Sequence, residues 1–259
     1  MFDYHMHSTV SFDGHDAPVD MARAALERGL REICFTDHID YQENDDTMVF
    51  DFDHYGRVYD RLEMPGLLIR RGMEFGITPD NAWQLERDLK RRDFDFVIGS
   101  VHCVDGVDVY IEPFWEGKTT REAYAIYLEE AYKAVCAHRD FDVLGHLTFV
   151  SKCRGNPNKV PVDYREHRQI VDAILEELVK KGKGLEINTS GVDRCGVYLP
   201  SAEYLRRFKE LGGQIVTVGS DAHDTKRVGQ YSREACELLK DIFGYVCTFE
   251  NRQPIFHKL

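Results

Sequence analysis

Met1-Phe-Asp-Tyr-His-Met-His-Ser-Thr-Val-Ser-Phe-Asp-Gly-His15 is the stretch on which the fold of this chain depends. Its alternating apolar residues at positions 2, 4 and 6 predict a strand that begins almost at the first methionine. His5 and His7 stand two apart on that strand, so both imidazoles point to the same face. Such a pair can bind one cation, because neutral imidazole is the commonest metal ligand, but it also fits two packed or solvated histidines. The rest of the chain decides between these two interpretations.

Apolar runs alternate with helical patterns along the whole chain. Strands are predicted at residues 2–6, 32–38, 67–75, 96–104, 143–150, 184–190 and 214–223. Helices are predicted at residues 18–30, 55–64, 81–92, 119–139, 161–181, 200–211 and 233–243. A last strand is possible at 245–249, and the acidic stretch 41–52 is predicted to be a loop over one end of the fold. Strand and helix alternation of this length predicts right-handed βαβ units and a parallel sheet.

An open doubly wound sheet and a closed barrel can both be built from seven such units. Gly14 stands alone after the first strand, where a nucleotide-binding sheet would carry a glycine-rich phosphate loop. We therefore expect a closed α/β barrel of the (β/α)7 type, TIM-like in its architecture. Because no proline-, glycine- or serine-rich linker and no internal repeat divides the units, we expect one domain over residues 1–259.

The composition narrows the class of partner. Of the 259 residues, 43% are hydrophobic and 30% are charged, as in an ordinary soluble globular protein. The net charge of −12 argues against a nucleic-acid partner and is compatible with a small substrate that bears positive charge. No apolar run reaches membrane-spanning length, and the N-terminus lacks the pattern of a signal peptide. Seven scattered cysteines without a Cys-x-x-Cys pair are typical of reduced thiols, so we expect a cytoplasmic protein.

Six of the predicted strands end in or near a histidine or a carboxylate. In a parallel barrel these ends converge on the carboxyl face, where active sites lie. Nine such ligands exceed the three or four that a single zinc needs, and they suit two or three transition metals with at least one bridging carboxylate. Because cysteine is absent from the pattern, we expect zinc, manganese or iron. The nine candidate metal ligands are His5, His7, His15, His38, Glu74, His102, His146, Asp221 and His223.

Six motifs in the right order resemble the polymerase and histidinol phosphatase (PHP) superfamily. They are His-x-His at 5–7, Thr-Asp-His at 36–38, Gly-Met-Glu-Phe-Gly at 72–76, Gly-Ser-Val-His at 99–102, Gly-His at 145–146 and Gly-Ser-Asp-Ala-His at 219–223. Within the superfamily the chain is similar to the stand-alone histidinol-phosphate phosphatases, over residues 2 to roughly 250. The resemblance implies a distorted seven-stranded (β/α) barrel that holds a trinuclear metal centre.

The resemblance also implies how the ligands are shared among the metals. It assigns His5, His7, Glu74 and Asp221 to one metal, Glu74, His102 and His146 to the second, and His15, His38 and His223 to the third. The loop after His-x-His varies in length within the family, so Asp13 is the alternative to His15.

The chemistry implied by this centre is hydrolysis of a phosphate ester. Two metals about 3.5–4 Å apart can lower the pKa of a bridging water and stabilise the attacking and leaving oxygens. A metal-bridging hydroxide would attack phosphorus in line and expel an alcohol, while the third metal neutralises charge on a phosphate oxygen. Glu74 would bridge two metals, and Asp221 would orient the nucleophile as well as bind a metal.

Cationic side chains are also expected to bind the phosphate. Arg154 and Arg194, in the loops after the fifth and sixth strands, are the candidates because a guanidinium matches phosphate oxygens. In the family an arginine often follows Asn-Thr-Ser-Gly closely, and here Arg194 is slightly displaced from that position. We expect Lys152 to be an exposed loop charge. This displacement leaves open that the enzyme acts on a different phosphorylated metabolite.

Other polar residues have weaker assignments. Asp37 either orients an imidazole or caps a strand end, and the sequence leaves both open. Candidates for binding the amine and imidazole of histidinol phosphate are Asp108, Glu112 and Trp115. No chemistry is assigned to His54, His138, His167 or His257, and we expect the tail that carries His257 to fray.

The predicted function is that of a metal-dependent phosphatase that hydrolyses L-histidinol phosphate in histidine biosynthesis. The alternative is a phosphoesterase for another phosphorylated metabolite or for nucleotides and oligonucleotides, although the acidic charge opposes nucleic acid. Two alternatives of other classes are less well supported. A non-catalytic metal-binding domain would not need open metal positions. A deaminase-like barrel commonly places a lysine at a strand end, and no predicted strand ends in a lysine here. The sequence leaves self-association undecided.

Overall fold

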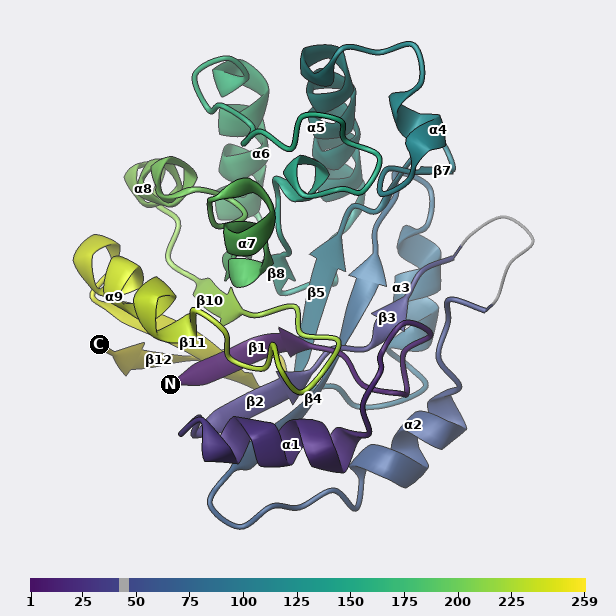
Figure 1. Ribbon diagram of the computed structural model, residues 1–259, viewed down its shortest axis with the longest axis vertical. Coiled ribbons are helices and arrows are strands. Elements are labelled where there is room, and N and C mark those ends of the chain that lie inside the picture. Colours follow the sequence, from purple (N-terminus) through teal and green to yellow (C-terminus); the bar gives the residue numbers. More distant parts are fainter. Residues whose placement is uncertain (42–46) are drawn as a thin grey trace.

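In the computed structural model, which describes residues 1–41 and 47–259, seven parallel strands follow one another around a nearly closed barrel (Figure 1). In spatial order they are β1 (Phe2–Met6), β2 (Glu32–Phe35), β4 (Leu68–Gly76), β5 (Phe96–Ser100), β8 (Val143–Leu144), β9 (Gly184–Asn188) and β10 (Val216–Gly219). The circle closes where Met6 pairs with Ala222 in parallel. There the N–H of His7 donates to the carbonyl of Ala222 and the N–H of Asp221 to that of His5, both at 2.8 Å. The predicted (β/α)7 barrel is confirmed.

The predicted strand at 32–38 is divided into two pieces. β2 pairs with the first half of β4, and the chain then leaves the sheet at Thr36 and Asp37. It returns as β3 (His38–Ile39), which pairs with the second half of β4 so that His38 stands opposite Glu74. The division therefore places a histidine beside the carboxylate of the neighbouring strand. Residues 42–46 of the predicted acidic loop lie outside the described residues.

The helices lie outside the strands, and α1 and α2 are on the opposite side of the barrel from α5 and α6 (Figure 1). Thr119 and Glu122 form a reciprocal capping box that fixes the start of α5. None of the helices in the described part of the chain is long and apolar enough to cross a membrane. The helices are α1 (Pro18–Glu27), α2 (Phe52–Tyr59), α3 (Ala82–Asp88), α4 (Glu112–Trp115), α5 (Thr120–Ala137), α6 (Arg168–Lys180), α7 (Val192–Cys195), α8 (Ala202–Glu210) and α9 (Ser232–Ile242).

Most elements are shorter than the sequence predicts, and two of these differences affect the segments near the site. The helix predicted over 161–181 begins only at Arg168, because the preceding segment bonds to other parts of the fold. Its Val162 receives a hydrogen bond from Tyr204 and donates one to Ser151. The strand predicted over 143–150 ends at Leu144, and a 3₁₀ turn (Phe149–Ser151) follows. This turn decides which side chains of the next loop face the barrel.

The C-terminal tail does not fray as predicted, because it forms an antiparallel hairpin of β11 (Tyr245–Glu250) and β12 (Gln253–Lys258). Asn251 and Arg252 both have positive φ, as a two-residue type I′ turn requires. The backbone N–H of Asn251 donates to Asp95, just before β5. His257 Nε2 lies 2.7 Å from Thr248 Oγ1, across the hairpin. The hairpin thus packs against the amino ends of the barrel strands and leaves the carboxyl ends open.

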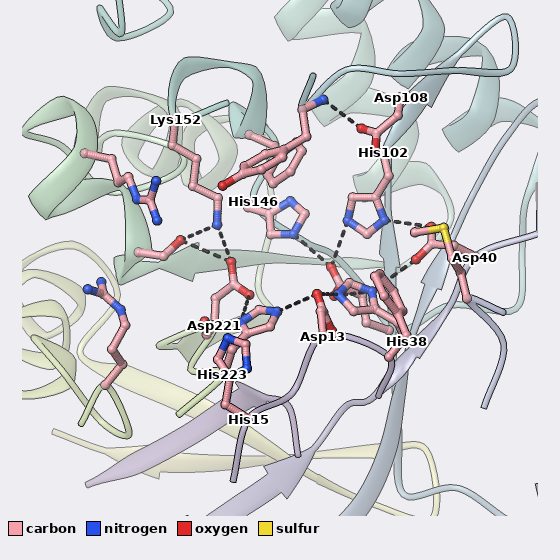
Figure 2. A pocket seen from close by; sticks show the side chains of 18 of the residues that line it. Asp13, His15, His38, Asp40, His102, Asp108, His146, Lys152, Asp221 and His223 are labelled. Carbon is pink, nitrogen blue, oxygen red and sulfur yellow. Dashed lines mark hydrogen bonds and ion pairs between the residues drawn. The ribbon is translucent and has the colours of Figure 1, made fainter. Parts of the chain in front are cut away.

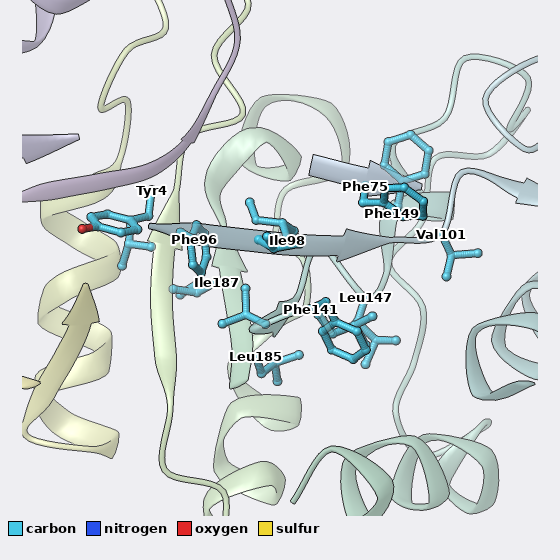
Figure 3. Close-up of a cluster of buried hydrophobic side chains, with 14 of the residues drawn as sticks. Tyr4, Phe75, Phe96, Ile98, Val101, Phe141, Leu147, Phe149, Leu185 and Ile187 are labelled. Carbon is cyan, nitrogen blue, oxygen red and sulfur yellow. The ribbon is translucent and has the colours of Figure 1, made fainter. Parts of the chain in front are cut away.

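The hydrophobic core fills the inside of the barrel and the space between the barrel strands and the helices (Figure 3). Tyr4 and Phe96 meet edge to face with ring centroids 5.3 Å apart, and Phe249 of the hairpin packs on Phe96 at 4.8 Å. Ile98 on β5 and Phe141, just before β8, are fully buried. Burial of an aromatic or aliphatic side chain stabilises the fold by about 1.5–3 kcal/mol. This packing holds the strand ends that carry the polar residues.

Candidate metal centre

A cavity of about 510 Å³ opens at the carboxyl ends of the strands (Figure 2). Its size is that of a pocket for a small molecule. Histidines and carboxylates form its floor, and its wall also carries aromatic and cationic side chains. The residues that line it are Phe12, Asp13, His15, His38, Asp40, Met48, Glu74, His102, Asp108, Tyr110, His146, Phe149, Lys152, Ser190, Arg194, Asp221, His223, Asp224 and Arg227.

Glu74, near the end of β4, lies at the centre of the polar cluster and is fully buried. Its two oxygens lie close to the ring nitrogens of five histidines. Oε2 lies 3.1 Å from His5 Nε2, 3.4 Å from His7 Nε2 and 3.2 Å from His38 Nδ1. Oε1 lies 2.8 Å from His146 Nε2 and 3.3 Å from His102 Nε2. One carboxylate therefore reaches imidazoles from four strand ends, as a bridging ligand would.

Asp221 and Asp13 extend the cluster on either side of His7. Asp221 Oδ1 lies 3.7 Å from His5 Nε2 and 3.4 Å from His7 Nε2. Asp13 Oδ2 lies 3.0 Å from His223 Nε2 and 3.5 Å from His38 Nε2 (Figure 2). The described residues form four overlapping groups with metal-binding geometry: His7–Asp13–His38–His223, His5–His7–Glu74, His5–His146–Asp221 and His38–Glu74–His102.

His15 is the one predicted ligand that joins none of the four groups found among the described residues. Its backbone N–H donates to the carbonyl of His223, and its side chain is exposed at the edge of the cavity. Asp13, the alternative, occupies the expected position between His38 and His223. The loop after β1 turns so that its carboxylate, rather than its imidazole, faces the centre. The structure therefore favours Asp13 over His15 as the ligand from this loop.

Several buried atoms of the cluster have no hydrogen-bond partner among the described residues. They include His5 Nε2, both ring nitrogens of His7, Asp13 Oδ1 and Glu74 Oε2. A buried polar atom without a partner costs about 1–3 kcal/mol. A divalent cation would satisfy these lone pairs, so the donor set fits transition metals that accept nitrogen and oxygen ligands.

The electrostatics of the cluster also favour a cation. Burial opposes protonation of His38, but Glu74, Asp13 and Asp40 outweigh it and raise its pKa to about 9. Burial, together with the neighbouring His223 and His38, lowers the pKa of His7 to about 3. The carboxylates thus attract positive charge to the site, while His7 at its middle stays neutral and able to ligate. A bound metal would compete with protons for the imidazole nitrogens, because only the neutral ring can ligate.

Two carboxylates that the sequence analysis did not select hold the imidazoles from behind. Glu186 on β9 lies 2.7 Å from His5 Nδ1, and Asp40 lies 2.8 Å from His102 Nδ1 and 3.1 Å from His38 Nδ1. For His5 and His102, the carboxylate at Nδ1 fixes the tautomer and leaves Nε2 as the ligand. Both carboxylates have a signal in the sequence. Glu186 stands within an apolar strand, and Asp40 comes two residues after the candidate ligand His38. Asp37, which was considered for this role, instead accepts hydrogen bonds from Ser8 and Tyr59.

The end of β10 has a backbone adapted to this packing. A Cβ atom at Gly219 would lie 2.2 Å from Glu186 Oε1 and 2.3 Å from the Cβ of His5, so only glycine fits there. Asp221 has a φ of 55°, a left-handed conformation that is uncommon outside glycine. Strained residues of this kind cluster at functional sites. The Gly-Ser-Asp-Ala-His motif is therefore required by the shape of the site as well as by its ligands.

The cationic residues differ from the prediction. Arg154 is exposed and does not line the cavity, whereas Lys152, expected to be a loop charge, is buried in the cavity wall. Lys152 Nζ donates to Asp221 Oδ2 and, at 2.7 Å, to Ser190 Oγ (Figure 2). The 3₁₀ turn after β8 directs Lys152 inward and Arg154 outward. Arg194 lines the cavity as expected, and Arg227 lines it as well.

Of the three candidates for binding the organic part of a substrate, only Asp108 lines the cavity. Asp108 lines the cavity at the end of a short hairpin of β6 (Cys103–Val104) and β7 (Val107–Asp108). Trp115 is buried in the core with its indole N–H on the carbonyl of Val109, and Glu112 is exposed away from the cavity. Tyr110 and Phe149, which were not predicted, stack in the cavity wall with centroids 6.2 Å apart.

The four histidines without assigned chemistry lie away from the cavity lining. His138 is buried, and its Nε2 lies 2.9 Å from the carbonyl of Thr78 and 2.8 Å from Asn81 Oδ1. His167 precedes α6, His54 is exposed in the first turns of α2, and His257 is in the hairpin.

Comparison with known proteins places these features in a family. A family model described as the PHP domain matches residues 3–190. The histidinol-phosphatase of Lactococcus lactis is 32% identical over 252 residues, 95% of this chain and 93% of that protein. The crystal structure of histidinol phosphate phosphatase from Lactococcus lactis, complexed with zinc, L-histidinol and phosphate, has a TM-score of 0.88 at 30% identity, with 98% of each chain covered. A structure from Listeria monocytogenes, 20% identical with a TM-score of 0.73 over 90% of this chain and 99% of its own, shares the fold.

Proposed function

The chain belongs to the PHP domain family, and we propose that it is a metal-dependent phosphomonoesterase that hydrolyses L-histidinol phosphate to L-histidinol and phosphate. The observation that carries the proposal is the position of Glu74, whose two oxygens lie within 3.4 Å of ring nitrogens from five histidines. A buried carboxylate among imidazoles with unpaired lone pairs is a site for more than one cation. The Lactococcus lactis relative, which binds zinc, L-histidinol and phosphate, supports the same substrate here.

We propose two to three divalent transition metals, zinc, manganese or iron, as the cofactors. Glu74 would be shared between groups, with Asp13 replacing His15 in the group that holds His38 and His223. When bound, such metals lower the pKa of a water and neutralise charge on phosphate oxygens. The remaining ligands in these groups are His5, His7, His102, His146 and Asp221.

The chain's own residues would orient the phosphate. Lys152 is fixed by Asp221 Oδ2 and Ser190, so its ammonium is directed into the cavity without loss of further side-chain entropy. Arg194 on α7 adds a second positive charge on the same wall. These cations would attract the phosphate dianion, while the carboxylates behind the imidazoles hold the ligands in position.

The organic part of the substrate would lie toward Asp108 and the stacked rings of Tyr110 and Phe149. Asp108 Oδ1 accepts the N–H of Tyr110 at 2.7 Å, which fixes the carboxylate at the cavity wall. A carboxylate beside aromatic rings suits an amine and an imidazole, because it pairs with positive charge while the rings stack.

The test compares turnover of three substrates by the metal-loaded protein. L-histidinol phosphate should be hydrolysed far faster than p-nitrophenyl phosphate or single-stranded DNA. Comparable rates on all three would contradict the proposed substrate. A faster rate on another member of a panel of phosphomonoesters would assign the enzyme to that metabolite, and hydrolysis of DNA alone would favour the exonuclease alternative.

A further inference from the structure

Arg227 lies in the cavity wall, in the segment 224–231 that follows β10. We propose that Arg227 binds the phosphate group of the substrate and that Asp193 is the positioning residue that holds its guanidinium. The proposal rests on the proposed function, because it takes a phosphomonoester as the ligand. It adds a third cation to Lys152 and Arg194 on the cavity wall.

Asp193 connects two segments that are far apart in the sequence. Its Oδ2 accepts hydrogen bonds from Arg227 Nη1 at 3.2 Å and from Gln230 Nε2 at 3.0 Å, and its Oδ1 accepts one from Tyr231 Oη at 2.6 Å. Asp193 also stands next to Arg194 on α7. A single carboxylate thus fixes the segment that carries Arg227 to the helix that carries Arg194, and both arginines line the cavity.

The segment 224–231 is fixed from its other side by the first βα unit. The guanidinium of Arg28 donates to the carbonyls of Thr225 and Val228 at 2.6 and 2.7 Å, and to that of Lys226 at 2.8 Å. The buried Asp3 accepts the N–H of Gly229 through Oδ2 at 2.8 Å. These bonds hold the backbone in place before any ligand binds. A preorganised cation loses less entropy when it binds an anion.

The guanidinium of Arg227 has donors left for a phosphate. Among the described residues its hydrogen bonds are confined to the one from Nη1 to Asp193, although a guanidinium carries five N–H donors. The planar fork can therefore bind a carboxylate on one edge and phosphate oxygens on the other. Because Arg227 lines the cavity, a phosphate bound there could reach these remaining donors.

The first experiment measures phosphate binding to the zinc-loaded protein. Competitive inhibition of p-nitrophenyl phosphate hydrolysis by inorganic phosphate, and calorimetric titration with inorganic phosphate, are compared for wild type, R227A, R227K and K226A. Lys226 is the matched control, because it is the exposed neighbour with the same charge and does not line the cavity. We expect R227A to raise Ki and Kd for phosphate by about tenfold or more, as loss of a hydrogen bond to a charged group would, and K226A to leave them within about twofold.

The R227K variant distinguishes phosphate binding by residue 227 from its structural ion pair with Asp193. A lysine can keep the ion pair with Asp193 but lacks the fork, so phosphate binding should stay weak while the melting temperature returns toward wild type. D193N should weaken phosphate binding less than R227A does, and it should add nothing in the R227A background. Additive effects in this double-mutant cycle would overturn the positioning role of Asp193.

Two results would overturn the role of Arg227. One is a phosphate Ki and Kd in folded R227A equal to those of K226A. The other is that R227A loses phosphate binding and R227K restores both the binding and the melting temperature in full. In that case Arg227 would only anchor the segment 224–231 to Asp193. Wild-type protein that binds phosphate but hydrolyses no phosphomonoester would overturn the proposed function, whereas the calorimetric comparison would still decide the role of Arg227.

Discussion

Replacement of Asp40 by asparagine should weaken metal binding, although Asp40 would not itself touch a metal. Asp40 is buried, with Oδ1 2.8 Å from His102 Nδ1 and Oδ2 3.1 Å from His38 Nδ1. Asparagine replaces one of the two carboxylate oxygens with an amide donor and removes the charge, so either the hydrogen bond to His102 Nδ1 or the contact with His38 Nδ1 would be lost. The carboxylate packs directly against Gly76 of β4, where a Cβ atom would lie only 2.0 Å from Asp40 Oδ1, so a side chain at position 76 would displace it.

The size of the effect follows from the number of imidazoles affected. Loss of one carboxylate behind a ligating histidine costs about 10–100-fold in metal affinity. Each factor of ten equals about 1.4 kcal/mol, so the range is about 1.4–2.7 kcal/mol. Asp40 reaches His102 and His38, which share one group, and His38 also belongs to a second group, so we expect two binding steps to weaken in D40N.

The assay is a zinc titration of chelator-treated protein in the presence of a competing chelator, with activity measured at limiting and saturating zinc. D40N should need about 10–100-fold more free zinc for half-maximal activity and recover much of it at saturation. D37N is the matched control, because Asp37 is also buried near His38 but bonds to Ser8 and Tyr59. An unchanged zinc affinity in D40N, or an equal loss in D37N, would refute the argument.

Three further perturbations test other parts of the site and fold. E74Q should lose measurable turnover while it keeps its far-UV circular dichroism, because a neutral amide cannot bridge cations; full activity would remove Glu74 from the mechanism. K152M should raise KM for the phosphomonoester by about tenfold or more through loss of a charged donor, and an unchanged KM in steady-state kinetics would contradict this. Burial lowers the pKa of His138, so protons bind the unfolded chain more tightly and the free energy of unfolding falls as pH drops through the ordinary pKa near 6.5. Urea denaturation from pH 7.5 to 5.5 should show a shallower fall for H138Q, and identical slopes would exclude this contribution.

The barrel and most of its polar residues could be predicted because both follow from the regular part of the chain. Strand and helix periods identify the βαβ units, and the ends of parallel strands converge whatever the loops do. Glu74 and the histidines from β1, β3, β5, β8 and β10 therefore gather as expected. The possible strand at 245–249 is confirmed as β11, but its partner β12 was missed because the two-residue turn is Asn251-Arg252, which lacks the glycine that usually marks a type I′ turn.

The loop residues could not be predicted in the same way, because the direction of a side chain after a strand depends on the local turn. A 3₁₀ turn directs Lys152 inward and Arg154 outward, and the loop after β1 presents Asp13 in place of His15. The carboxylates of Asp40 and Glu186 act only through contacts made in three dimensions. Arg227 and Asp193 meet across 34 positions of sequence, a pairing that no local pattern shows.

The most direct test of the metal centre is the metal content of the purified protein. Inductively coupled plasma mass spectrometry on protein isolated without chelators, with its concentration determined by amino-acid analysis, should find more than one equivalent of transition metal per chain. Removal of that metal should abolish phosphatase activity, and its return should restore it. A single tightly bound equivalent in fully active protein would contradict a centre in which Glu74 is shared between cations.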